Sequence, residues 1–146
     1  MTEELVTLET AKLLKKKGFN ERTLFAYKNN GDLYQDPNRI ESSYNSLQVP
    51  ELCENFHTCA NFIPCNKCQI AIHLISAPNQ SFAQKWLRET KNLHIEISYM
   101  YENYWIYDIL TIPNHDLVGL SDRPIIHYKS YEEALEAGIQ ETLKLI

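Results

Sequence analysis

The sequence lacks the features that would assign a function at first sight. No apolar run approaches the roughly 18 residues of a transmembrane helix, and the acidic start of the chain, Met1 to Glu4, is unlike a signal peptide. There is also no glycine-rich phosphate loop, no paired acidic motif and no serine nucleophile elbow. We therefore expect a protein that contacts no membrane and acts by binding rather than as an enzyme.

Positive charge is also scarce. The chain carries 14 basic and 19 acidic side chains, which gives a formal net charge of −5. Nucleic-acid binding draws much of its affinity from basic side chains that neutralise phosphates, so this balance argues against a nucleic-acid partner. Lys12 and the run Lys15 to Lys17 crowd one predicted helix, where a solvated face is a simpler explanation than a phosphate site.

The composition is that of an ordinary globular domain. Hydrophobic residues make up 44% of the 146 residues and charged residues 23%, and Gly is scarce. A chain of this length buries roughly two-thirds of its unfolded surface on folding. We expect a single domain over residues 1–146, with a cysteine-rich loop at 53–68.

Hydrophobic periodicity and capping residues predict three helices. The first begins after Thr7 and stops at Gly18, and the second follows Asn79. The third follows Ser130, which forms a capping box with Glu133.

Strands are predicted around these helices, at 23–28, 33–34, 69–75, 93–99, 104–112 and 125–128. The alternation in 93–99 and the reversal at Glu102-Asn103 predict an antiparallel hairpin with 104–112, packed on one face by the second helix. The polar stretches 36–50 and 114–124 are predicted loops. Together these patterns predict an α+β fold, a mainly antiparallel sheet with about three helices packed on it.

The predicted hairpin is rich in aromatic residues. Aromatic side chains are enriched at protein interfaces, so they are the candidate residues for contact with a ligand or partner. Alternate members of the set could instead pack on the core or stack across the strands. The candidates are Tyr99, Tyr101, Tyr104, Trp105 and Tyr107.

All four cysteines lie in one short segment. Cys65 and Cys68 have the Cys-x-x-Cys spacing that lets two thiolates reach one tetrahedral zinc. Cys53 and Cys59 would complete the ligands of a structural zinc, with His57 as a substitute ligand. The spacing of the other cysteines matches no common zinc module, so free or packed thiols are the alternative, and no other cofactor is expected.

One histidine–carboxylate pair is a candidate for catalysis. His115 and Asp116 are adjacent in a predicted loop, where a base and an orienting carboxylate could meet. A single adjacent pair is also a common feature of polar loops. His73 and His94 fall in predicted strands, which favours a structural role for both.

Three blocks of the sequence form a recognisable pattern: Leu5–Phe19, then Ser76–Pro78 leading into Ala83–Glu89, then Tyr131–Gly138 through Leu143–Ile146. In this order they resemble a family of small phage- and prophage-related proteins of gut Bacteroidetes. The resemblance implies a small, cytoplasmic, phage-related α+β protein and transfers no catalytic residue. The cysteine segment lies outside the three blocks, so a zinc site would be particular to this chain.

We therefore expect a phage- or prophage-related accessory protein that binds a protein partner or self-associates as a homo-oligomer. One alternative is a counter-defence protein that sequesters a nucleotide-like signal, with aromatic rings stacked on its base, or that blocks a host protein. Another is a zinc-dependent hydrolase built on the cysteine and histidine cluster.

Overall fold

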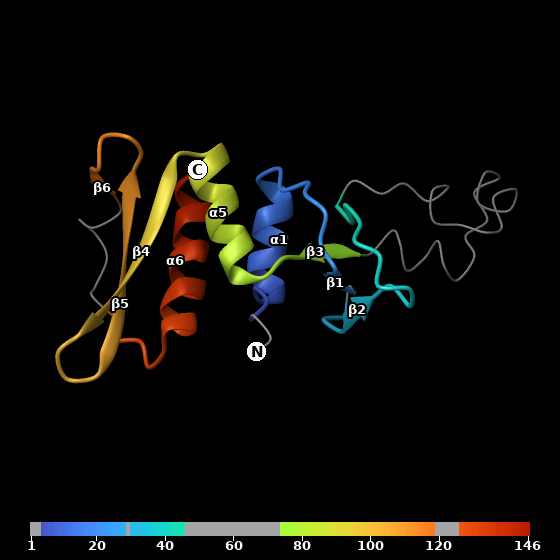
Figure 1. Cartoon of the computed structure of the whole chain (residues 1–146), viewed down its shortest axis with the longest axis horizontal. Helices are drawn as coiled ribbons and strands as arrows, with labels where there is room; N and C mark the ends of the chain where they lie inside the picture. The colour runs from blue at the N-terminus through green and yellow to red at the C-terminus, as the bar shows by residue number, and fades with distance from the viewer. Residues whose placement is uncertain (1–3, 29, 46–73, 119–125) are drawn as a thin grey trace, which may run out of the picture.

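The three helices that the structure describes lie between two small sheets. In the computed structural model, residues 4–28, 30–45, 74–118 and 126–146 are described. Within these ranges there are three helices and two three-stranded antiparallel sheets, with one sheet at each end of the row of helices (Figure 1). The α+β class is thus confirmed, and the antiparallel strands divide into two sheets.

Each helix begins at the capping residue that the sequence predicts. The side chains of Thr7, Asn79 and Ser130 each accept a hydrogen bond from the main-chain N–H three residues further on, which satisfies a donor that the first turn leaves without a helical partner. Gly18 follows the first helix with φ +96°, as a left-handed C-terminal residue. The helices are α1 (Leu8–Lys16), α5 (Gln80–Thr90) and α6 (Tyr131–Leu145).

The first sheet has β1 at its centre, in the order β2-β1-β3. Its strands are β1 (Phe25–Tyr27), β2 (Leu33–Gln35) and β3 (Ile75–Ala77). The turn between β1 and β2 holds Gly31 at φ +94°, as the Asn-Gly pair predicts. Of the strand predicted at 69–75, residues 69–73 lie outside the described residues. β3 begins at Ile75, the last predicted residue, and continues to Ala77.

The second sheet contains the predicted hairpin, in the order β4-β5-β6. β4 (Leu93–Met100) and β5 (Tyr104–Thr111) pair antiparallel over eight residues, and β6 (Leu117–Val118) adds a short third strand. β6 lies in the stretch predicted as a loop, because a two-residue strand carries no readable periodicity. The strand predicted at 125–128 is wrong in its described part, where only Tyr128 pairs, as an isolated bridge to Trp105.

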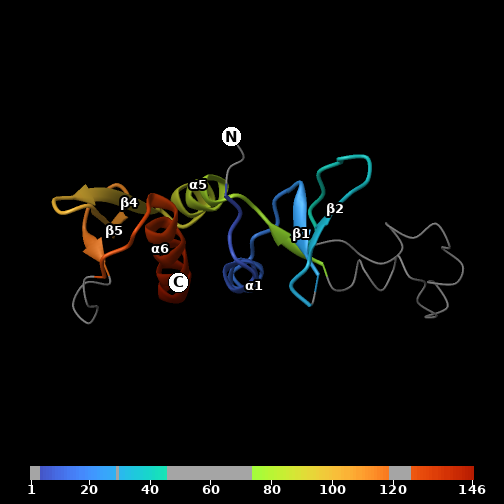
Figure 2. The ribbon, with the colours of Figure 1, turned by 90° about the horizontal axis from the view of Figure 1, so that it is seen from below.

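Two helices pack on the hairpin, whereas the sequence predicts one. The predicted helix, α5, packs on β4 and lies beside it in the view from below (Figure 2), and α6 packs on both β4 and β5. The side-chain amide of Gln84 in α5 donates to the main-chain carbonyl of Ile95 in β4, at 2.7 Å. α1 packs between α6 and β3, and so links the second sheet to the first.

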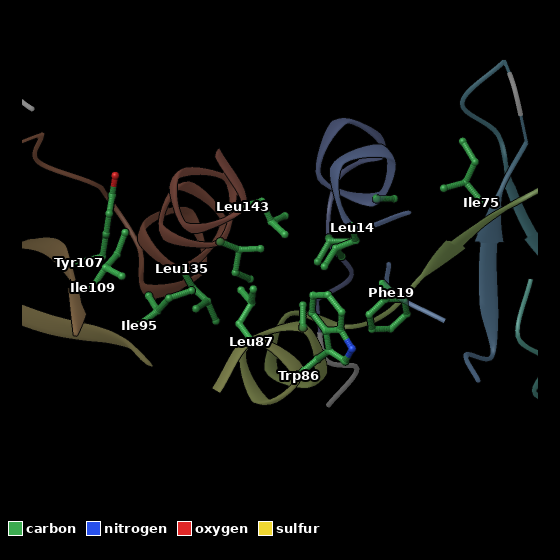
Figure 3. Close-up of a cluster of buried hydrophobic side chains, with 14 residues drawn as sticks. Leu14, Phe19, Ile75, Trp86, Leu87, Ile95, Tyr107, Ile109, Leu135 and Leu143 are labelled. Atoms are coloured by element: carbon green, nitrogen blue, oxygen red, sulfur yellow. The ribbon is translucent and has the colours of Figure 1, made fainter. Parts of the chain in front are cut away.

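One continuous cluster of buried side chains joins these elements (Figure 3). Phe19, just after α1, makes edge contacts with Phe82 and Trp86 of α5, with ring centroids 5.8 and 5.3 Å apart. On the other side of the helices, Ile95 and Ile109 of the hairpin are fully buried against α6. The core therefore runs through all three helices and fixes the hairpin relative to α6.

The segment before α1 is attached to the first sheet by Tyr27. Its phenol donates to the main-chain carbonyl of Val6, at 2.6 Å. Burial, and secondly the charge of Glu136, raise the pKa of Tyr27 above its ordinary value of 10.0. The unfolded chain therefore loses this proton at lower pH than the folded chain does.

This shift predicts a loss of stability in alkali. The contribution of Tyr27 is complete below pH 10.0, and the free energy of unfolding should fall as the pH rises from there towards the raised pKa. The Tyr27→Phe variant should be less stable at neutral pH by about 1 kcal/mol, because the hydrogen bond is lost, and its stability should decline less steeply above pH 10. Urea unfolding at a series of pH values measures both slopes, and equal slopes would contradict the prediction.

Candidate partner-binding surface

The turn of the β4–β5 hairpin is a three-residue loop at one end of the molecule. Met100 pairs with Tyr104, and Tyr101, Glu102 and Asn103 connect them. Glu102 and Asn103 have φ values of 78° and 67°, in the left-handed region that residues other than glycine rarely adopt. Figure 1 shows the turn projecting past the N-terminal end of α6, so this helix does not cover the tip of the hairpin.

Three aromatic rings gather where the hairpin passes the start of α6. Tyr99 and Trp105 are directly opposite in the strand register, and their ring centroids lie 4.9 Å apart. The ring of Trp105 also makes an edge contact with Tyr131, the first residue of α6, at 5.6 Å. These rings are therefore contributed by two strands and one helix and share one face of the sheet.

Much of this aromatic area is exposed. Tyr99 is 57% exposed, Tyr131 40%, and Tyr101 in the adjoining turn 90%. Trp105 is half-buried beneath them. We call these four side chains the aromatic surface: Tyr99, Tyr101, Trp105 and Tyr131.

Two members of the aromatic surface, Trp105 and Tyr99, are held by hydrogen bonds. Trp105 and Tyr128 exchange two main-chain hydrogen bonds of 2.9 Å. The phenol of Tyr99 donates to the side-chain oxygen of Asn103 in the turn. Tyr99 and Trp105 are thus held in position before any partner arrives, which lowers the entropy that binding costs.

The structure separates the five aromatic residues that the sequence singles out. Tyr107 lies on the same face but is only 8% exposed, because α6 covers it. Tyr104 points to the opposite face of the sheet, where its ring stacks on His127 at 3.7 Å. Tyr131 was missed by the sequence reasoning, although its place directly after the Ser130 cap puts it at the exposed end of a helix.

A polar cluster around Glu136, separate from the aromatic surface, lies where α1, α5 and α6 meet. The carboxylate of Glu136 accepts hydrogen bonds from the N–H of Thr7 at 2.8 Å, the hydroxyl of Thr10 at 2.7 Å and the amide of Gln80 at 3.1 Å. A pocket of about 440 Å³ opens beside it, with Glu132 among its lining residues. Because three donors already hold the carboxylate, we interpret Glu136 as a structural link between helices, and the sequence analysis did not find it.

The predicted metal site cannot be compared with the structure. Cys53, Cys59, Cys65, Cys68 and His57 all lie outside the described residues. Within the described ranges no cluster of three or more potential metal ligands is seen. A zinc ion held by the cysteine segment therefore stays a prediction, and so does the hydrolase that would depend on it.

The candidate catalytic pair, His115 and Asp116, belongs to the turn between β5 and β6. The N–H of His115 donates to the carbonyl of Thr111 at 2.8 Å, and the N–H of Asp116 donates to the Thr111 hydroxyl at 3.0 Å. His115 has a positive φ of 63°. Both residues thus shape the turn that brings β6 to β5.

Comparison of the chain with protein-family models, with curated proteins and with solved structures finds no match. None of the helices within the described ranges is long and apolar enough to cross a membrane. The aromatic surface therefore has to be interpreted from its own geometry.

Proposed function

We propose that this chain acts by binding a protein partner, and that the aromatic surface is the contact. The observation that carries the proposal is the exposure of Tyr99 and Tyr131 around the ring of Trp105, with Tyr101 exposed in the adjoining turn. Tyrosine and tryptophan are the residue types most enriched at the energetic centres of protein interfaces. A single exposed aromatic residue needs no explanation, but a contiguous group held in place by the fold does.

The charges around the aromatic surface favour a partner with basic residues. Glu102 lies in the turn, and Glu132 and Glu133 lie in the first turn of α6, directly after Tyr131, so these three carboxylates outnumber the one basic side chain nearby in the described ranges, Lys129. Cations are attracted both to carboxylates and to the faces of aromatic rings. The same carboxylates repel phosphate, so this surface supports a protein partner better than the nucleotide-like signal of the alternative hypothesis.

The resemblance of the three sequence blocks to phage- and prophage-related proteins adds a biological context to the proposal. A small accessory protein of a phage needs a complementary surface for a protein of the host or of the phage. A preformed aromatic patch supplies such a surface without a catalytic group.

The proposal predicts that binding depends on Tyr101. A photo-reactive benzoylphenylalanine at position 101 should crosslink to a protein in an extract of gut Bacteroidetes cells, and that protein can then be purified. Its affinity should fall at least tenfold in the Tyr101→Ala variant, a loss of about 1.4 kcal/mol. Because Tyr101 is 90% exposed, this substitution should leave the fold intact.

Leu33 provides the matched control. It is an apolar residue of β2, 48% exposed, and its sheet lies at the other end of the row of helices (Figure 1). Leu33→Ala should leave the affinity unchanged, and a probe at position 33 should not crosslink. A partner that binds Tyr101→Ala as tightly as the original chain would refute the proposal, and so would a partner that loses as much affinity in Leu33→Ala as in Tyr101→Ala.

A further inference from the structure

The free edge of β4 has main-chain groups that are open to another strand. β4 is the terminal strand of the order β4-β5-β6. Trp105 exchanges its main-chain hydrogen bonds with Tyr128, on the far side of β5, so the pair formed by Trp105 and Tyr99 is not hydrogen-bonded within the hairpin. The main-chain groups of Tyr99, and of Ile97 two residues earlier, therefore point away from β5.

α5 closes part of this edge. The side-chain amide of Gln84 donates a hydrogen bond to the main-chain carbonyl of Ile95. Ile95 lies two residues before Ile97, and its main-chain groups also point away from β5. Within the described part of the chain, no hydrogen bond to the main-chain N–H or C=O of Ile97 or Tyr99 is seen. The open edge is therefore the short stretch Ile97–Tyr99.

We infer that a second copy of this chain pairs with the open edge, antiparallel, about a two-fold axis at Ser98. The pairing joins two three-stranded sheets into one. In this register Ile97 lies opposite Tyr99 of the second copy, and each such pair exchanges both N–H···O bonds. An aromatic side chain opposite a β-branched one is among the favourable cross-strand pairs.

The two other two-fold registers of this stretch are unfavourable. An axis at Ile97 would pair Tyr99 with Ile95, whose carbonyl Gln84 already holds. An axis at Tyr99 would place Glu96 directly opposite Glu102 of the second copy, twice in each dimer, and like charges in that position destabilise a sheet. With the axis at Ser98, Glu96 faces an uncharged methionine, Met100.

Charge complementarity supports a second copy as the occupant. Gln84 shows which side of α5 faces β4, and Arg88, four residues later, lies on that side, whereas the ammonium of Lys91 lies over the ring of Trp86. The axis at Ser98 brings Glu102 of one copy across from the first residues of β4 in the other, beside Arg88 at the end of α5. The two-fold symmetry makes the same acidic-to-basic contact twice.

The sequence of the open edge is also suited to pairing. Exposed edges are commonly protected by lysine or proline, which block the addition of a strand. Residues 96–100 contain neither. The one charged side chain of this stretch, Glu96, faces Met100 in the proposed register and so does not oppose the pairing.

The dimer involves Tyr99 of the aromatic surface, but it can be tested separately from the proposed function. Ser98 points to the face opposite Tyr99 and Trp105, because successive side chains of a strand alternate. A substitution at Ser98 therefore tests self-association and leaves the aromatic surface in place.

Sedimentation of the full chain tests the inference. The original chain should sediment as a dimer of the 17.1 kDa protomer. Ser98→Lys places two positive charges directly opposite each other at the axis and should weaken dimerisation at least tenfold, whereas Ser98→Thr should retain it. A monomer at every accessible concentration, or a dimer equally stable in folded Ser98→Lys, would overturn the inference.

A disulfide tests the register itself. Residues at the axis form a non-hydrogen-bonded pair, with Cα atoms about 4.5 Å apart, which lies within the range of a disulfide. With oxidised glutathione as the oxidant, Ser98→Cys should form a bond between positions 98 of the two copies, identified by peptide mass spectrometry. Glu96→Cys is the control, because position 96 lies on the same face of the sheet as position 98 and this variant contains the same native cysteines. It should form no disulfide between the two positions 96. The reverse pattern, or a dimer without the bond at position 98, would overturn the proposed axis.

Discussion

Replacing Gly138 by alanine is expected to destabilise the protein by about 1–2 kcal/mol, and replacing it by valine by about 3 kcal/mol. This is the opposite of the usual effect in a helix, where alanine is favoured over glycine by about 1 kcal/mol. Gly138 lies in the middle of α6, buried against the hairpin. Urea unfolding of the two variants measures the change.

The reason is the close approach of α6 to the sheet. A Cβ atom at Gly138 would lie 2.7 Å from Cγ2 of Ile95 and 3.2 Å from two ring carbons of Tyr107. Ile95 is fully buried and β-branched, so its side chain has little freedom to move away. A larger residue must therefore push α6 away from β4 and β5, and this movement would also separate Tyr131 from Trp105.

A second substitution distinguishes this steric cost from an effect on the backbone. Ile95→Ala removes the methyl group that meets the new Cβ, so the double variant with Gly138→Ala should lose less stability than the sum of the two single variants. Gly18→Ala is the matched control: Gly18 has φ +96° and nothing within 4 Å of its Cβ position, so its cost is conformational and should simply add to that of Ile95→Ala. If Gly138→Ala were stabilising, the close approach would be wrong.

The sequence predicts well those parts of the fold that depend on neighbouring residues. Thr7, Asn79 and Ser130 cap helices whose first turns follow directly, and the hairpin alternates over residues that are adjacent in the chain. The division into two sheets could not be predicted, because it depends on the pairing of β1 with β3, which are distant in the sequence. Short strands such as β3 and β6 also carry too few residues for a periodic signal.

The candidate surface was predictable only in outline. Alternation places Tyr104 and Trp105 on opposite faces of β5, but it does not show which face α6 covers. That depends on Gly138, whose missing side chain lets α6 lie over Tyr107 and leave Tyr99 uncovered. The sequence analysis therefore could not separate the buried Tyr107 from the exposed members.

Glu136→Ala is expected to destabilise the protein by about 2–3 kcal/mol. In the sequence Glu136 looks like an ordinary polar residue of an amphipathic helix. In the structure its carboxylate accepts three hydrogen bonds, from Thr7 and Thr10 at the start of α1 and from Gln80 at the start of α5. Hydrogen bonds to a charged group contribute about 1.5–3 kcal/mol each, although water in the adjoining pocket can replace part of this.

Two controls identify the cause. Glu132→Ala removes a carboxylate one turn earlier on α6 that is exposed in the same pocket, and should cost less than about 1 kcal/mol. Thr10→Val removes one of the three donors, so its cost should be smaller in the Glu136→Ala background than in the original chain. Because Thr10 is fully buried in α1 and Glu136 belongs to α6, a non-additive result would show that this carboxylate holds the two helices together. Additive costs, or equal effects of Glu132→Ala and Glu136→Ala, would mean that the two helices are joined by their apolar contacts alone.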